Sequence, residues 1–273
     1  MRGKIKMYLI IIIVILVALF LYVQNNLLYI NKIELNSSEL SLKSDYKIVH
    51  LSDLHNKMFG DNQNKLVDKI KEIKPDMIVY TGDIVDSYSY KEEPALILMA
   101  ELLKIAPVYY VTGNHEIRLG VYEMLKEKFT KLGVTVLEDE VHKIYVEDNE
   151  IDLIGLKDGQ IEELEYNLNE ILINNKSDNF KMLLSHRPDG IEVYSNNNID
   201  LAFTGHAHGG QVRIPFVGGI IAPGQGFFPE YTEGKHTMNN TTMVVSRGLG
   251  NSAFPFRILN RPEIVVLEIK GKY

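Results

Sequence analysis

Cysteine is absent from this chain of 273 residues. Disulfide scaffolds, zinc fingers, thiol nucleophiles and lipid attachment through sulfur are therefore excluded. Basic residues are scarce relative to acidic ones, with 29 lysines and arginines against 36 aspartates and glutamates and a formal net charge of −7. Because duplex nucleic acid attracts basic surfaces, no nucleic-acid partner is expected.

The chain also has no repeat of fixed period and no glycine fingerprint of a dinucleotide site. Its hydrophobic residues make up 45% and its charged residues 24%, as in an ordinary globular protein. The length suits one or two domains. The sequence does not define an oligomeric state.

One long hydrophobic run, at residues 7–23, carries no charge. As a helix it would be about 25 Å long, close to the ~30 Å hydrocarbon core of a bilayer. A buried core helix and a cleaved signal peptide are the alternatives, but the run lacks a polar face and no small-residue cleavage site follows it. We therefore expect one uncleaved N-terminal transmembrane helix.

This helix divides the chain into three parts. Residues 1–30 are the expected membrane anchor, the polar residues 31–44 read as a short tether, and residues 45–273 form the expected catalytic domain. Three basic residues precede the apolar run, and such charges favour the cytoplasmic side. The sequence therefore predicts a single-pass cell-membrane protein with a cytoplasmic N-terminus and an extracytoplasmic catalytic domain.

Short β-branched runs alternate with amphipathic stretches along the rest of the chain. Buried strands are expected at residues 46–51, 77–80, 108–112, 151–156, 181–185, 201–204 and 264–269. Apolar residues at helical spacing mark 66–73 and 121–132, and residues 94–105 are apolar almost all round, as in a helix packed between layers. This alternation predicts an α/β domain. Residues 135–156 read as a β meander, and the glycine-rich residues 205–226 read as loop.

Metal-competent or acid–base side chains follow five of these strands. They are Asp53 and His55, Asp83 and Asp86, Asn114 and His115, His186, and His206 and His208. Ligands bind at the carboxyl edge of the strands in α/β sheets, so we expect these residues to meet there. Carboxylates with neutral imidazoles suit two divalent ions of Mn, Fe, Zn or Co. A pair of such ions ~3.5–4 Å apart can act on both oxygens of a phosphoryl transfer.

Five blocks carry a family resemblance. They are Asp-Leu-His at 53–55, Gly-Asp-Ile-Val-Asp at 82–86, Gly-Asn-His-Glu at 113–116, His186, and Gly-His-Ala-His at 205–208. In this order they resemble the motifs of the calcineurin-like metallophosphoesterase superfamily. The resemblance implies a four-layer α/β/β/α sandwich with two mixed sheets. It also implies a metal-dependent hydrolase of phosphoric ester or pyrophosphate bonds.

The resemblance further implies a role for each residue. Two ligand sets are implied, one of Asp53, His55 and His208 and one of Asn114, His186 and His206. Asp83 would bridge the two metals, and a bridging hydroxide would attack phosphorus in line. His115 would protonate the leaving oxygen or stabilise charge near it, and Asp86 would orient His115.

The substrate is less well defined than the chemistry. Ser87 stands where phosphoprotein phosphatases carry an arginine, which disfavours a protein substrate. Residues 52–56 and 205–211 resemble a membrane-associated or exported bacterial branch related to UDP-diacylglucosamine pyrophosphohydrolase-like enzymes. We therefore expect a phosphodiester, pyrophosphate or lipid-linked phosphate near the membrane. Asn56 and Arg247 are the candidates for contacting it.

Two other functions stay open at this point, a soluble nucleotide phosphodiesterase and a scaffold or binding protein that keeps the fold. A second open question concerns Phe227, Phe228, Phe254 and Phe256. They are either a lipid-facing lip or ordinary core packing between layers.

Overall fold

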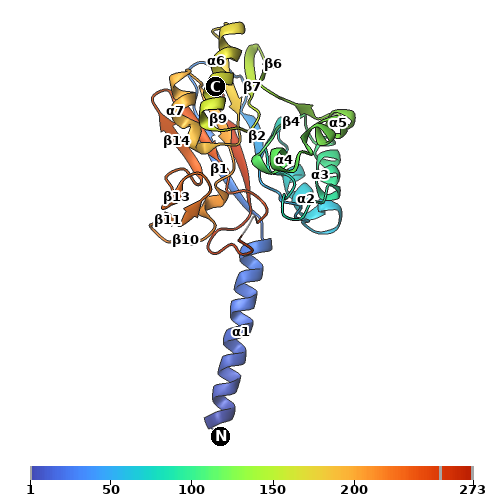
Figure 1. Cartoon of the computed structure of the whole chain (residues 1–273), viewed down its shortest axis with the longest axis vertical. Coiled ribbons are helices and arrows are strands. Elements are labelled where there is room, and N and C mark those ends of the chain that lie inside the picture. The colour runs from blue at the N-terminus through green and yellow to red at the C-terminus, as the bar shows by residue number, and fades with distance from the viewer. Residues whose placement is uncertain (1, 252–253, 272–273) are drawn as a thin grey trace.

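A computed structural model of the chain describes residues 2–251 and 254–271. The chain begins with α1 (Arg2–Asn26), which projects away from the rest of the molecule (Figure 1). Within the described residues, Gly3–Asn26 is the one helix long and apolar enough to cross a membrane, and none of its most apolar window is buried.

The first of two large sheets has six strands. In spatial order they are β1 (Tyr29–Leu35), β16 (Glu263–Ile269), β2 (Tyr46–Leu51), β3 (Met77–Thr81), β4 (Val108–Val111) and β5 (Thr135–Val136). All neighbours are parallel except β16 and β2. Strands β2, β3 and β4 therefore end at the same edge of the sheet, as the sequence predicts.

The second sheet also has six strands and is also mixed. Their order is β14 (Gly234–Met238), β15 (Thr241–Val245), β9 (Leu201–Thr204), β8 (Phe180–Leu184), β7 (Asn149–Gly155) and β6 (Glu140–Val146). The four central strands are parallel, and each outer strand pairs antiparallel with its neighbour.

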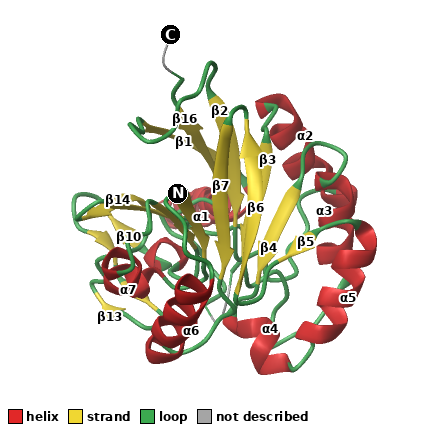
Figure 2. Cartoon of the chain, turned by 90° about the horizontal axis from the view of Figure 1, so that it is seen from above, coloured by secondary structure: helices red, strands yellow, loops and turns green. Residues whose placement is uncertain are grey.

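Helices cover the outer face of each sheet, which confirms the expected four-layer α/β/β/α sandwich (Figure 2). The first sheet is covered by α2 (Asn64–Ile73), α3 (Glu93–Leu102) and α5 (Tyr122–Leu132), and the second by α6 (Ile161–Asn174) and α7 (Ile191–Asn196). Strand side chains alternate between the layers: Ile48 packs between the sheets, whereas Val49 packs under the helices.

The segment 31–44, expected as a tether, is instead part of the folded domain. Its first residues belong to β1, which lies along β16, and Leu40 and Leu42 are buried with Ile33 between the sheets. Strand β1 is an edge strand whose exposed side chains are polar, so its sequence looks like a linker.

The expected meander is correct only in its second half. Strands β6 and β7 form an antiparallel hairpin, but β5 pairs with β4 in the other sheet. The chain between β5 and β6 thus crosses from one sheet to the other. The expected loop at 205–226 also contains two small hairpins, β10 (Arg213–Ile214) with β11 (Gly218–Gly219) and β12 (Ile221–Ala222) with β13 (Gly226–Phe227).

Strand register places the end of α1 near the carboxyl edge of the first sheet. Tyr29, three residues after α1, pairs with Glu263 at the start of β16. Two residues later in β16, Val265 pairs with His50, the last residue but one of β2. The chain therefore leaves α1 at the level where β2 ends and where Asp53 follows.

Candidate metal centre

All seven predicted metal ligands come together at the carboxyl ends of the strands. Asp53 and His55 follow β2, Asp83 follows β3, Asn114 opens the short helix α4 (Asn114–Leu119) after β4, His186 follows β8, and His206 and His208 follow β9. Six of the seven are buried; Asn114 is partly exposed. Residues more than a hundred positions apart thus form one centre where the two sheets meet.

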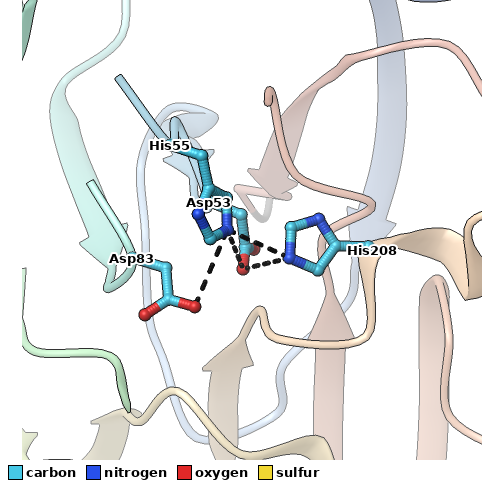
Figure 3. A group of neighbouring side chains, drawn as sticks. All are labelled: Asp53, His55, Asp83 and His208. Carbon is cyan, nitrogen blue, oxygen red and sulfur yellow. Dashed lines mark hydrogen bonds and ion pairs between the residues drawn. The ribbon is translucent and has the colours of Figure 1, made fainter. Parts of the chain in front are cut away.

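The first ligand group consists of Asp53, His55, Asp83 and His208 (Figure 3). Their ligand atoms all lie within 4.8 Å of one another. The Nε2 atoms of His55 and His208 are 3.1 Å apart, and Nε2 of His208 is 3.4 Å from Oδ1 of Asp53. Two imidazoles and two carboxylates therefore point at one small volume.

The second ligand group consists of Asp83, His186 and His206. Nε2 of His186 lies 3.2 Å from Oδ2 of Asp83 and 3.1 Å from Nδ1 of His206. The same Oδ2 lies 3.7 Å from Nε2 of His55 in the first group. Oδ1 of Asp83 accepts a hydrogen bond from the His115 backbone N–H at 2.8 Å, which leaves Oδ2 directed between the two groups.

The chemistry of these donors fits two divalent transition-metal ions. Both groups offer only imidazole nitrogens and carboxylate oxygens, the ligands that Mn, Fe, Zn and Co accept. Oδ1 of Asn114 is buried and has no hydrogen-bond partner in the described part of the chain. A buried amide oxygen without a partner costs free energy unless something such as a cation meets it.

Burial and the Asp83 carboxylate determine which histidines at the centre are charged. Burial lowers the pKa of His55 to about 3 and holds the pKa values of His206 and His208 well below their usual range. Although burial opposes a charge on His186, the Asp83 carboxylate raises the pKa of that imidazole to about 10. His55, His206 and His208 are therefore neutral, the form that ligates metals, whereas His186 carries a proton beside Asp83 that an arriving cation would displace.

Five of the ligands adopt an uncommon backbone conformation. Asp53, His55, Asp83, His206 and His208 all have positive φ angles, between 47° and 66°. Residues other than glycine rarely occupy this left-handed region, and they cluster there at functional sites. Close packing also requires glycine at position 113, because a Cβ there would lie 2.3 Å from Oδ1 of Asp83.

Glu116 supports the centre from behind and was given no role by sequence reasoning. Its carboxylate is fully buried and accepts hydrogen bonds from the backbone N–H groups of Asp83, Val85 and Gly113 at 3.0, 3.1 and 2.7 Å. It therefore ties the turn after β3 to the turn after β4. Its place in the Gly-Asn-His-Glu block was the available signal.

His115 lies beside the ligands, with its Nε2 atom 3.9 Å from Oδ2 of Asp83. Its Nδ1 atom accepts a hydrogen bond from the Ser87 backbone N–H at 2.9 Å and lies 3.4 Å from Oδ1 of Asp86. Asp86 is thus close to His115, but the hydrogen bond to Nδ1 comes from the Ser87 backbone, and an orienting role of Asp86 stays a prediction. Because Nδ1 accepts this bond, the proton of the neutral ring is on Nε2.

A cavity of about 310 Å³ opens onto the ligands. Besides Asp83, Asn114 and three histidines, it is lined by Tyr88, Arg118, Arg187, Pro223 and Gly224. Nε of Arg187 pairs with Oδ1 of Asp158 at 2.7 Å, and its Nη1 lies 3.3 Å from Nε2 of His206. Sequence reasoning missed both arginines, because neither belongs to the motif blocks.

The two predicted substrate contacts lie elsewhere. Arg247 pairs with the carboxylates of Glu233 and Glu263 and lies over the ring of Tyr29, so it is not a lining residue of this cavity. Asn56 accepts a hydrogen bond from the Asp86 backbone N–H at 3.2 Å, and its amide donates to the carbonyl oxygen of Ser89. Both side chains thus make contacts within the protein, and their part in substrate binding stays a prediction.

The sequence of this chain is similar to those of known proteins. Residues 46–210 match the family described as calcineurin-like phosphoesterase. YkuE, an uncharacterized metallophosphoesterase of Bacillus subtilis, is 34% identical over 233 residues that cover 83% of this chain and 79% of YkuE. The phosphodiesterase YaeI of Escherichia coli is 30% identical over 236 residues, 82% of each chain.

A more distant relative is named as a transmembrane protein. The Danio rerio transmembrane protein with metallophosphoesterase domain is 25% identical over 237 residues, which cover 82% of this chain and 53% of the relative. The family match, the relatives and the clustered ligands agree. This chain belongs to the calcineurin-like phosphoesterase family and is a metal-dependent phosphoester hydrolase.

Proposed function

We propose that this hydrolase uses two metal ions and cleaves a phosphodiester, pyrophosphate or lipid-linked phosphate close to a membrane. One observation carries the two-metal part of the proposal: Oδ2 of Asp83 lies between two separate ligand groups. A single carboxylate shared in this way is what a pair of ions requires. The name of the relative YaeI supports a diester as the reacting group.

In this proposal Asp53, His55 and His208 hold one ion, and Asn114, His186 and His206 hold the other. Asp83 contributes to both. When bound, two divalent ions stabilise negative charge on the phosphoryl oxygens and make water a stronger nucleophile. Glu116 and the Ser87 backbone keep Asp83 and His115 in place while the reaction proceeds.

His115 is the proposed proton donor. Its Nε2–H lines the cavity, whereas its Nδ1 is occupied by the Ser87 N–H group. In this neutral form the Nε2–H group can donate a hydrogen bond to the departing ester oxygen; transfer of a proton requires the imidazolium form, whose Nδ1–H would face Oδ1 of Asp86, 3.4 Å away. Arg118 and Arg187 line the same cavity and bring positive charge to a negatively charged phosphate.

The proposed location is the outer face of a cell membrane. Helix α1 would span the bilayer, and Arg2, Lys4 and Lys6 would keep its N-terminus in the cytoplasm. The register of β1, β16 and β2 puts the carboxyl edge that carries the ligands at the end of the domain where α1 enters. The site would then act on phosphate esters near the bilayer surface.

Hydrolysis of soluble esters tests the proposal. The full chain, in detergent, would be stripped of metal and reloaded with manganese, and the rates for bis-p-nitrophenyl phosphate and p-nitrophenyl phosphate would be compared. We expect metal-dependent turnover of the diester that falls about a hundredfold or more in His115→Ala. The matched control is His142→Ala, an exposed histidine on β6. Equal turnover in both variants would remove His115 from the mechanism, and no metal-dependent turnover would overturn the proposal.

A further inference from the structure

A second cavity, of about 470 Å³, adjoins the metal cavity. Its lining consists of Gln211, Ile221, Ala222, Pro223, Gly224, Gly226 and Phe254, none of which is charged. Pro223 and Gly224 line both cavities. The separation between them is thin, because a Cβ on Gly224 would lie 3.9 Å from Nε2 of His206. An apolar chain in the second cavity could therefore belong to a molecule whose phosphate is at the ligands.

Exposed apolar side chains gather on the loops at residues 216–228 and 254–259. Phe254 lines the second cavity, Phe227 pairs with its lining residue Ile221, and Phe256 contacts Phe254, whereas Phe216, Val217 and Leu259 line a further cavity with Arg213. We call these exposed side chains the apolar rim: Phe216, Val217, Phe227, Phe228, Phe254, Phe256 and Leu259. Phe216 is fully exposed, and Phe227 and Phe228 are 74% and 68% exposed, which excludes core packing for these residues. Exposed apolar residues gathered in this way mark an interaction surface.

Charge is almost absent from the same loops. Residues 214–228 contain no charged side chain. Arg213, which precedes these residues, pairs with Glu233. Arg257, which lies between Phe256 and Leu259, is fully buried. A protein or nucleic-acid partner is usually met by polar and charged groups at the edge of an interface. An uncharged aromatic surface instead suits the acyl boundary of a bilayer.

Hydrogen bonds join one loop of the rim to the end of α1. Oδ1 of Asn25 accepts hydrogen bonds from the Arg257 backbone N–H at 2.9 Å and from Nδ2 of Asn251 at 3.0 Å. Oε1 of Gln24 accepts one from the Asn260 backbone N–H at 3.1 Å. The loop with Phe254, Phe256 and Leu259 therefore stays beside the last turn of α1. Figure 1 shows β10, β11 and β13 at this same end of the domain.

We propose that the second cavity binds an acyl chain of a membrane lipid whose phosphate ester reaches the metal centre, and that the apolar rim enters the bilayer beside α1. This inference rests on the proposed function, because it places the lipid phosphate at the same ligands. It narrows the substrate class to lipid-linked phosphates taken directly from the bilayer.

Alkyl phosphates of two lengths test the cavity. The manganese-loaded full chain would be assayed with bis-p-nitrophenyl phosphate, with butyl and octyl phosphate added as inhibitors. We expect octyl phosphate to inhibit at least tenfold more strongly, because its longer chain buries more CH₂ groups. Ile221→Glu places a charge in the cavity and should bring the ratio of the two inhibition constants to about one, whereas Ile173→Glu, on α6, should leave it unchanged. Taking the ratio within each variant removes any change in basal rate.

A tryptophan probe tests the rim, since the chain has no tryptophan of its own. In nanodiscs of lipids brominated in the acyl chains, Phe216→Trp should lose most of its fluorescence, and Tyr145→Trp, exposed on β6, should not. Equal inhibition by the two alkyl phosphates, or an unquenched tryptophan at 216, would overturn the inference. An inactive wild-type chain would instead overturn the proposed function.

Discussion

At the residue scale, Glu116 supports the metal centre without being one of its predicted ligands, so a substitution there tests the support alone. Its two oxygens accept three backbone N–H groups. Glu116→Gln replaces one oxygen by an N–H₂ group that must face a backbone donor. We expect the free energy of unfolding of the metal-free chain to fall by about 1–3 kcal/mol and its metal affinity to fall about 10–100-fold.

Urea unfolding followed by circular dichroism measures the first effect, and a metal titration measures the second. Glu165→Gln, an exposed glutamate on α6, is the matched control and should change stability by less than about 0.5 kcal/mol. If Glu116→Gln behaves like this control, the carboxylate does not support the two turns.

Motif position predicted which candidate ligands cluster, but not which residues lie beside them. Asp53, His55 and Asp83 were recognisable because they follow strands in fixed motif blocks. Arg187 was not recognisable, because only the fold brings its guanidinium against His206 and the cavity. Sequence also did not reveal that the side chain of Arg247 pairs with Glu233 and Glu263. A substrate contact by Arg247 stays a prediction.

At the scale of elements, Glu138 links the segment after β5 to helix α5. It accepts hydrogen bonds from Lys126 on α5 and from Lys157 after β7, the latter at 2.6 Å. Partial burial alone would raise the pKa of Glu138, but the two lysines outweigh it and lower the pKa from 4.5 to about 2. The folded chain therefore keeps Glu138 charged at pH values where the unfolded chain protonates it.

Because its pKa is lowered on folding, Glu138 stabilises the folded chain less as the pH falls. The contribution of Glu138 to stability is complete above about pH 4.5 and is lost as the pH falls towards 2. Wild type should therefore exceed Glu138→Gln in free energy of unfolding by about 1 kcal/mol or less at pH 6, since the pair is partly exposed. The difference should shrink as the pH falls towards 3 in urea unfolding series of the metal-free chain. A difference that grows on acidification would contradict this.

The elements differ in how well their sequences define them. Strands β2 and β9 have the predicted bounds, because their residues are mostly buried and mostly apolar; β9 is buried throughout, whereas Lys47 and His50 interrupt the apolar run of β2. Strand β1 looked like a tether because an edge strand needs only one apolar face. The partner of β5 was missed because two residues carry no information about which sheet they join.

At the scale of the whole molecule, the proposed extracytoplasmic position of the domain rests on three charges at the N-terminus. The absence of cysteine allows a direct test with single introduced cysteines. Tyr145→Cys, on the exposed face of β6, should react with a membrane-impermeant maleimide in intact cells. Gly3→Cys should react only after the cells are permeabilised. The opposite pattern would place the catalytic domain in the cytoplasm.

The central claim of this account is that one carboxylate serves two metal ions, and the metal content of wild type and Asp83→Asn tests it most directly. The purified full chains would be reloaded with manganese, desalted and measured by mass spectrometry of the metal. We predict about two ions per wild-type chain, one or fewer in Asp83→Asn, and a loss of diester turnover of about a hundredfold or more. A variant that keeps two ions and wild-type turnover would contradict the account.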